Sequence, residues 1–194
     1  IVLLGAFVDS TSVGIYGAAK RVATLTSLIL VAVNIIVAPR FAALHAQGEH
    51  DALRTLAQNV TALMALLAVP ILLPFVLAPG WIMRLFGPEF SSGGVVLAIL
   101  ALGQFVNMAT GSVGYLLMMT GHEKAMRNTV LVSTAVLILL SVLLVPHFGM
   151  LGAAIATMVS MMVQNIMAAV LVYRKLSIIV LSLGGFKKLA RGTD

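Results

Sequence analysis

Long apolar runs separated by short polar turns dominate this chain and limit what it can fold into. Most runs approach or exceed about 20 residues, the length of a helix that crosses a bilayer. Of the 194 residues, 61% are hydrophobic and 9% are charged, and the mean hydropathy is +1.12. A soluble domain carries about 25% charged residues, so lipid must be the main solvent here. The sequence therefore predicts an all-α, polytopic transmembrane helix bundle, and the continuous runs exclude a porin-like barrel with alternating strands.

Five complete spans and part of a sixth are predicted from the lengths of these runs. The first eight residues are expected to be the end of a helix that is cut short. Prolines are expected to end two spans, one before Pro39 and one at Pro146. The polar stretch after Pro39 favours a helical hairpin in water, and HFGM at 147–150 predicts a tight turn. The complete spans are expected at about 13–38, 56–83, 94–120, 128–145 and 151–173.

Basic residues in the turns predict the orientation of the bundle. Because the spans alternate in direction, the turns form two sets, and one set together with the C-terminal tail holds nine cations while Arg84 stands in the other. Cytoplasmic loops carry the excess of Lys and Arg, so the basic set and the C-terminus are expected in the cytoplasm. We expect residues 1–175 to form one transmembrane lobe and 176–194 a basic cytoplasmic or interfacial tail. The nine cations are Arg40, Arg54, Lys124, Arg127, Arg174, Lys175, Lys187, Lys188 and Arg191.

Polar residues at helical spacing mark one face on each of three spans. Amide and hydroxyl groups suit the hydroxyls of a sugar, so these faces are candidates for a shared wet surface. Hydrogen bonding between packed helices explains the same residues, and both interpretations stay open. The faces are Tyr16, Lys20, Thr24, Ser27 and Asn34 in the first complete span, Gln104, Asn107, Gly111 and Tyr115 in the third, and Thr157, Ser160 and Gln164 in the fifth.

The adjacent cations Lys20 and Arg21 lie inside an apolar run and are the most unusual feature of the first complete span. A charge at membrane depth costs a few kcal/mol on insertion scales. One explanation is snorkelling, because Lys20 is expected only about 10 Å from the start of its helix. The other is a cavity role, in which the two cations bind an anion or an acid from another part of the protein.

Other kinds of chemistry find little support in the sequence. None of the acids lies deep in a complete span, and the four histidines all lie in turns. His45 and His50 share one turn, but two ligands make a poor metal site. There is no Walker-type phosphate loop and no cysteine. The net charge of +6 is explained by membrane orientation rather than by nucleic acid. We therefore expect no enzyme activity, metal, cofactor or nucleic-acid partner.

Several segments together resemble a known family of transporters. VGIYGAAKRV, VAPRFAALHAQGE, LFGPEFSSGGVVLAIL and VPHFGMLGAAIAT are similar, in order and spacing, to the C-terminal half of polysaccharide biosynthesis exporters. These belong to the multidrug/oligosaccharidyl-lipid/polysaccharide exporter superfamily and include the O-antigen flippases. The resemblance implies two six-helix lobes around a central cavity, of which this chain would be the second lobe with its first helix truncated. It also implies the bacterial cytoplasmic (inner) membrane as the location.

The resemblance further implies flipping of an undecaprenyl-pyrophosphate-linked oligosaccharide, such as an O-antigen repeat unit, by alternating access. Lys20 and Arg21 would attract the pyrophosphate, and Thr24 and Asn34 would continue the same cavity face. Partners would be the lipid-linked oligosaccharide, membrane lipid, the N-terminal lobe, and possible glycan polymerase and glycosyltransferases. Two alternatives stay open: a multidrug or cation antiporter of the same superfamily, and a non-transporting scaffold of a glycan-synthesis complex. Sugar contacts are expected at Gln104, Asn107 and Gln164, and bending between states at Pro70, Pro74 and Gly111.

Overall fold

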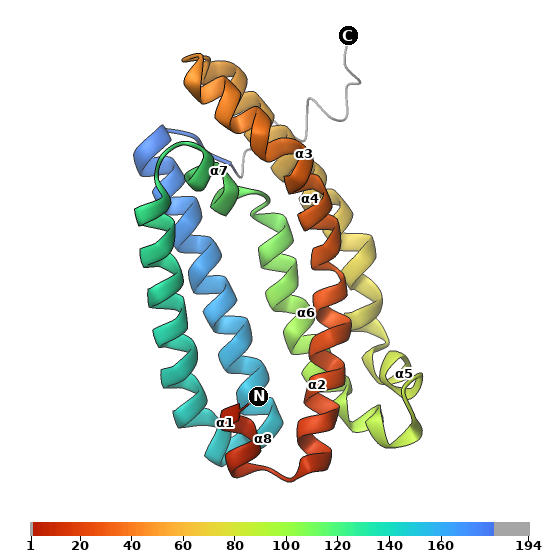
Figure 1. Cartoon of the computed structure of the whole chain (residues 1–194). Coiled ribbons are helices and arrows are strands. Elements are labelled where there is room, and N and C mark those ends of the chain that lie inside the picture. Colours follow the sequence, from red (N-terminus) through yellow and green to blue (C-terminus); the bar gives the residue numbers. More distant parts are fainter. Residues whose placement is uncertain (1, 181–194) are drawn as a thin grey trace.

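The structure, a computed structural model, describes residues 2–180, and every regular element in that range is a helix (Figure 1). Four stretches are long and apolar enough to cross a membrane: Ser10–Ala46, His50–Leu77, Pro88–Ala109 and Glu123–Leu176. The prediction of an all-α, polytopic bundle is confirmed. The elements are α1 (Val2–Phe7), α2 (Ser10–Leu25), α3 (Ser27–Ala46), α4 (His50–Leu77), α5 (Pro79–Arg84), the 3-10 helix η1 (Pro88–Gly93), α6 (Gly94–Ala109), α7 (Val113–Met119) and α8 (Glu123–Leu176).

Helix α8 folds back on itself at Gly149, so it crosses the bundle twice (Figure 1). Gly149 has φ 53° and ψ −129°, a conformation that is essentially confined to glycine. The arms 123–148 and 150–176 run antiparallel and approach each other closely near the turn. Gly152 allows this approach, since a Cβ atom at that position would overlap the carbonyl group of Leu144. With these two arms the described bundle has five helical passes, and the expectation of five complete membrane spans stays a prediction. The reversal at Gly149 falls within the predicted turn at 147–150.

Two predicted helix ends are wrong, and both were placed at prolines. Helix α3 continues through Pro39 to Ala46, and the first arm of α8 continues through Pro146 to the turn. Beyond Pro39, Phe41 is fully buried against Leu53 of α4. Burial of such a side chain contributes about 1.5–3 kcal/mol, which offsets the hydrogen bond that the proline removes.

The third complete span also departs from the prediction, because it is interrupted. Helix α6 ends at Ala109 and α7 begins at Val113, so the expected continuous helix over 94–120 is two helices. The residue at the centre of the break, Gly111, has φ 67°. A Cβ atom there would lie 2.9 Å from the Cα atom of Thr61, so glycine lets the break pack directly on α4.

The core consists of two main apolar clusters with a polar layer between them. The first cluster joins α1, α2, α5, the start of α6 and the turn of α8, with Tyr16 and Leu97 among its members. The second joins the α3–α4 hairpin, α7 and the end of α8, with Phe41 and Val172. Buried polar residues lie along the helices between these clusters. They include Thr26, Gln104, Thr110, Ser112, Ser133, Ser160 and Asn165.

The two ends of the bundle differ in charge. The α3–α4 turn, the α7–α8 turn and the end of α8 lie together at one end, which we call the basic end (Figure 1). The α1–α2 turn, α5, η1 and the α8 turn lie at the opposite end (Figure 1). The predicted grouping of the turns is confirmed, and Lys187, Lys188 and Arg191 lie outside the described residues. The cations at or near the basic end are Arg40, Arg54, Lys124, Arg127, Arg174 and Lys175.

Capping at the opposite end starts α2 earlier than the apolar run suggests. Asp9 is the N-cap, and its carboxylate accepts hydrogen bonds from the Ser12 hydroxyl at 2.8 Å and the Ser12 backbone N–H at 3.1 Å. These bonds hold the pKa of Asp9 below its ordinary value. Helix α2 therefore begins at Ser10, and Lys20 lies about 15 Å along it at 1.5 Å per residue. This is deeper than the sequence indicates.

The turn at Gly149 yields the first prediction. Gly149→Ala in the full-length protein should lower the melting temperature in detergent, because the strained backbone costs about 1–3 kcal/mol for any other residue. Gly17→Ala is the matched control, since Gly17 is helical and an added Cβ atom there meets nothing within 4 Å. Equal melting temperatures for the two variants would contradict the role assigned to Gly149.

Candidate functional site

A polar pocket of about 140 Å³ lies where α3, α6, α7 and the second arm of α8 meet. Its polar lining residues come from all four helices: Asn34 from α3, Asn107 from α6, Tyr115 from α7, and Gln164 with Asn165 from α8. The structure thus brings together three of the predicted site residues, Asn34, Asn107 and Gln164. Gly111, predicted as a hinge, also lines this pocket.

Hydrogen bonds fix the amide side chains on one side of the pocket. The Thr110 hydroxyl donates to Asn165 Oδ1 at 2.9 Å, and Asn165 Nδ2 donates to the Met161 carbonyl at 2.9 Å. Asn107 Nδ2 donates to Gln104 Oε1 at 3.3 Å, so the predicted residue Gln104 adjoins the pocket through its neighbour. These contacts hold the amides in set positions and leave part of their bonding capacity free.

The two arms of α8 are joined through the same polar layer. The Ser133 hydroxyl donates to Gln164 Oε1 at 3.2 Å, and the Ser160 hydroxyl donates to the Ser133 carbonyl at 2.7 Å. Sequence reasoning missed Ser133 and Thr110 as site residues. Thr110 follows Asn107 by three residues and so shares its helix face, a signal that could have found it, whereas nothing in the sequence links Ser133 to Gln164.

Asn34 differs from its neighbours because its side-chain oxygen has no hydrogen-bond partner. The residue is 1% exposed and lines the pocket, and its Oδ1 atom is buried. A buried acceptor without a partner costs about 1–3 kcal/mol. A hydroxyl group entering the pocket would supply the missing donor, so Asn34 is suited to bind a small polar group.

The polar residues predicted to share one face of the first complete span do not all point to the same side of the helix. Tyr16 is buried and its hydroxyl lies 2.9 Å from the Thr157 hydroxyl, whereas Lys20 and Thr24 are exposed and Asn34 is buried again. Steps of four residues drift by about 40° each on a helix, which takes Thr24 well away from Tyr16. Lys20, Arg21 and Thr24 therefore lie on the outer surface of the bundle and do not line the polar pocket.

Local hydroxyl groups break this span between α2 and α3. The Thr24, Thr26 and Ser27 hydroxyls donate to backbone carbonyls one turn back at 2.8, 2.6 and 2.6 Å. Such bonds compete with the helix ladder and bend helices. The break at Thr26 was not expected from the sequence, although three hydroxyl residues within four positions were a visible signal.

Helix α4 runs without interruption through Pro70 and Pro74. The predicted roles of these prolines and of Gly111 as hinges stay predictions.

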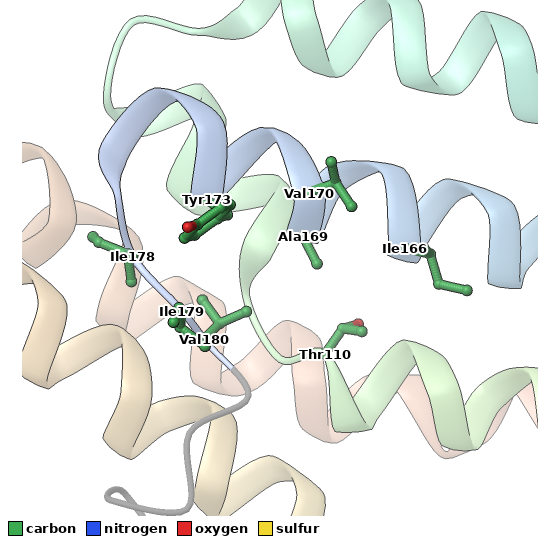
Figure 2. A pocket seen from close by; sticks show the side chains of 8 residues that line it. All are labelled: Thr110, Ile166, Ala169, Val170, Tyr173, Ile178, Ile179 and Val180. Atoms are coloured by element: carbon green, nitrogen blue, oxygen red, sulfur yellow. The ribbon is translucent and has the colours of Figure 1, made fainter.

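An apolar groove of about 340 Å³ adjoins the polar pocket. Figure 2 shows it bordered by α8 side chains, by residues 178–180 and by Thr110. Ile178 and Val180 are buried, and Gln58 Nε2 donates to the Ile179 carbonyl at 2.9 Å, so the described start of the expected tail packs on the bundle. Thr110 lines the groove while its hydroxyl bonds to Asn165 of the pocket. A molecule with an apolar chain and a polar head matches this pairing.

Comparison with known proteins shows that the sequence is similar to those of flippases. The sequence model of the lipid II flippase MurJ family matches residues 2–191. The chain is 32% identical over 171 residues to "Probable flippase AglR" of Haloferax volcanii, an alignment that covers 86% of this chain and 36% of that protein. It is 26% identical over 170 residues to "Probable low-salt glycan biosynthesis flippase Agl15" of the same organism, covering 87% and 36%. The chain thus spans about a third of the length of these relatives. Both names denote flippases rather than enzymes, in agreement with the sequence prediction.

The contact between Thr110 and Asn165 yields the second prediction. Thr110→Val should lower the melting temperature of the full-length protein, since a hydrogen bond between membrane helices contributes about 0.6 and at most about 1.7 kcal/mol. Thr24→Val is the control, because the Thr24 hydroxyl is exposed and bonds only to a carbonyl of its own helix. If both variants have the melting temperature of the wild type, the Thr110 contact contributes no stability.

Proposed function

This chain belongs to the lipid II flippase MurJ family, and from that premise we propose that it is part of a transporter that flips a lipid-linked oligosaccharide across the cytoplasmic membrane. The observation that carries the proposal is the amide-lined pocket beside an apolar groove within a membrane-spanning bundle. Amides suit sugar hydroxyls, and the groove suits a hydrocarbon chain. Alternating access between the two membrane faces would move the polar head through the bilayer.

The finer substrate proposal follows the resemblance of the sequence. We propose an undecaprenyl-pyrophosphate carrier bearing an oligosaccharide, with an O-antigen repeat unit as one candidate. The family name points to lipid II, and one relative is named for a low-salt glycan. A lipid-linked glycan is the coarser substrate class that these names support, and the proposed carrier adds an anionic pyrophosphate and an apolar tail to the sugar hydroxyls. Glycan polymerase and glycosyltransferases are the proposed protein partners.

The proposed position of the chain is the C-terminal lobe of a two-lobe protein. Lys20 and Arg21 would then face the cavity between this lobe and an N-terminal lobe, where they would bind the pyrophosphate. Their exposure on the bundle surface supports this role, as does the depth of Lys20 along α2, because a charge against lipid costs about 2.5–3.5 kcal/mol near the bilayer centre. Thr24, exposed one turn further along, would continue the cavity wall.

The proposed orientation places the basic end of the bundle in the cytoplasm. Six cations at or near that end, against Arg84 at the opposite end, support it through the positive-inside rule. The C-terminus would then be cytoplasmic. A bacterial inner membrane is the proposal from the sequence resemblance, whereas both named relatives come from an archaeon.

Other activities find less support. A cation or drug antiporter would need acids in its cavity, and the described acids Asp9, Glu49, Asp51, Glu89 and Glu123 all lie at or beside helix ends. A non-transporting scaffold would not need an amide pocket that adjoins an apolar groove. Flipping is therefore the activity that the described residues support best.

The surface cations yield the third prediction. Lys20→Ala combined with Arg21→Ala in the full-length protein should reduce export of the lipid-linked glycan, measured as surface glycan at matched expression. Lys20→Arg combined with Arg21→Lys retains both charges and should retain export. Normal export by the neutral double variant would exclude the cavity role.

The pocket yields the fourth prediction, on Asn34. Asn34→Leu is nearly equal in size and removes an oxygen that has no partner, so the melting temperature should be unchanged or raised. Surface glycan should nevertheless fall, because the acceptor for a sugar hydroxyl is lost. Leu30→Met, a conservative change at the apolar lining of the same pocket, is the control. Full export by Asn34→Leu would remove Asn34 from the site.

A further inference from the structure

A second cavity, of about 300 Å³, lies at the basic end of the bundle and is lined by three histidines and a lysine. His45 comes from the end of α3, His50 from the start of α4, His122 from the turn before α8, and Lys175 from the end of α8. Three separate parts of the chain thus bring nitrogen-bearing side chains to one cavity. It is distinct from the polar pocket, with which it shares no lining residue.

The imidazole groups retain nitrogen atoms that nothing in the bundle engages. His45 Nδ1 is buried and has no hydrogen-bond partner, and the His45 and His50 rings meet edge to face with centroids 6.3 Å apart. His122 Nδ1 lies 3.2 Å from the Thr120 hydroxyl, which donates its proton to the Leu116 carbonyl at 2.8 Å. Nε2 of His122 takes no part in that contact, and the tautomer of the ring decides which of its nitrogens donates.

The residues that line the cavity carry no negative charge. The acids nearest in sequence, Glu49, Asp51 and Glu123, are exposed, and the residues that line the cavity include no acid. The cations Arg40, Arg54 and Arg174 on the same helices are exposed as well. Helices α4 and α8 begin beside the cavity, whereas α3 and the second arm of α8 end there, so the helix dipoles largely offset one another. The positive character of the cavity therefore comes from its lining, which holds Lys175 and three imidazoles and no acid, and this lining favours an anion.

A metal ion is the other ligand that histidines bind. Among residues 2–180, no group of three or more His, Cys, Asp or Glu side chains is placed to hold one. Lys175 would also repel a cation. The lining thus suits an oxyanion that accepts hydrogen bonds from several N–H groups at once.

We infer that this cavity binds a phosphate group, as a phosphomonoester or pyrophosphate, and that binding strengthens as the pH falls. Histidine is the residue type whose charge changes near neutral pH, so a site built from three histidines gains positive charge as the pH falls. The phosphate belongs either to a lipid headgroup at the membrane surface or to a soluble anion, and both present the same oxygens. The inference concerns a site other than Lys20 and Arg21 and does not depend on the proposed flipping activity.

The test measures the melting temperature of the full-length protein in phosphatidylcholine nanodiscs at about pH 6 and about pH 8, which bracket the titration of histidine. The soluble probes are inorganic phosphate and sulfate, with chloride at equal ionic strength as reference. Sulfate keeps its two charges over this range, so any pH dependence of its effect arises in the protein. A second set of nanodiscs contains phosphatidic acid, which presents a lipid phosphomonoester.

The cavity variant combines His50→Gln with Lys175→Gln. Both residues are exposed, so they can be changed without disturbing the core. The matched control is His147→Gln combined with Lys124→Gln, which removes the same residue types outside the cavity. We expect the wild type and the control to be stabilised by sulfate or phosphate more at the lower pH. The cavity variant should bind at least about tenfold more weakly, because it loses two positively charged donors and one lost charge-assisted hydrogen bond already has a tenfold effect.

The outcomes separate the sources of the phosphate and can overturn the inference. Stabilisation by the soluble anions identifies a soluble ligand, and stabilisation by phosphatidic acid alone identifies a lipid headgroup. Either result supports the site if the cavity variant loses it and the control keeps it. An equal response in both double variants, or no response to any probe at the lower pH, would overturn the inference.

Discussion

The bilayer core offers a polypeptide backbone no hydrogen-bonding partner, so each span must satisfy its own amides and carbonyls. This constraint explains why the described chain is helical throughout its apolar runs, and why its interruptions are short. At the break between α2 and α3, the Thr26 hydroxyl donates to the Ala23 carbonyl. At the break between α6 and α7, the Thr110 and Gly111 amides donate to the Val106 and Met108 carbonyls. The one sharp reversal within a helix, at Gly149, lies at an end of the bundle.

Features of the fold that depend on burial and charge could be predicted from the sequence. The apolar runs predicted a polytopic helical bundle, and the alternation of the spans predicted which turns share an end; the structure agrees with both. The helix ends at Pro39 and Pro146 were predicted wrongly, because a proline rule considers one helix by itself. Phe41 lies beyond Pro39 and is buried by residues of α4, and no local pattern reveals that contact.

The candidate site was predictable only in part, for a similar reason. Helical spacing selected Asn34, Asn107 and Gln164, and these do line one pocket. The same reasoning grouped Lys20 and Thr24 with Asn34, although four-residue steps drift around the helix and leave Thr24 on the surface. Contacts between helices, such as that of Ser133 with Gln164, depend on how the spans pack and leave no trace in the spacing. The histidine cavity likewise depends on three parts of the chain that are distant in sequence.

The division of the core also has a mechanical consequence. Both helix breaks fall between the two main apolar clusters: Thr26 lies between Ala23 of the first and Leu30 of the second, and Gly111 precedes Val113 of the second. Between the two clusters lie polar contacts, each of which contributes about 0.6 kcal/mol between membrane helices, close to the thermal energy at room temperature. A smaller apolar cluster of α4 and α6 lies there too, and α4 and both arms of α8 continue past the breaks. At this level the bundle is therefore held together by its uninterrupted helices more than by its polar contacts.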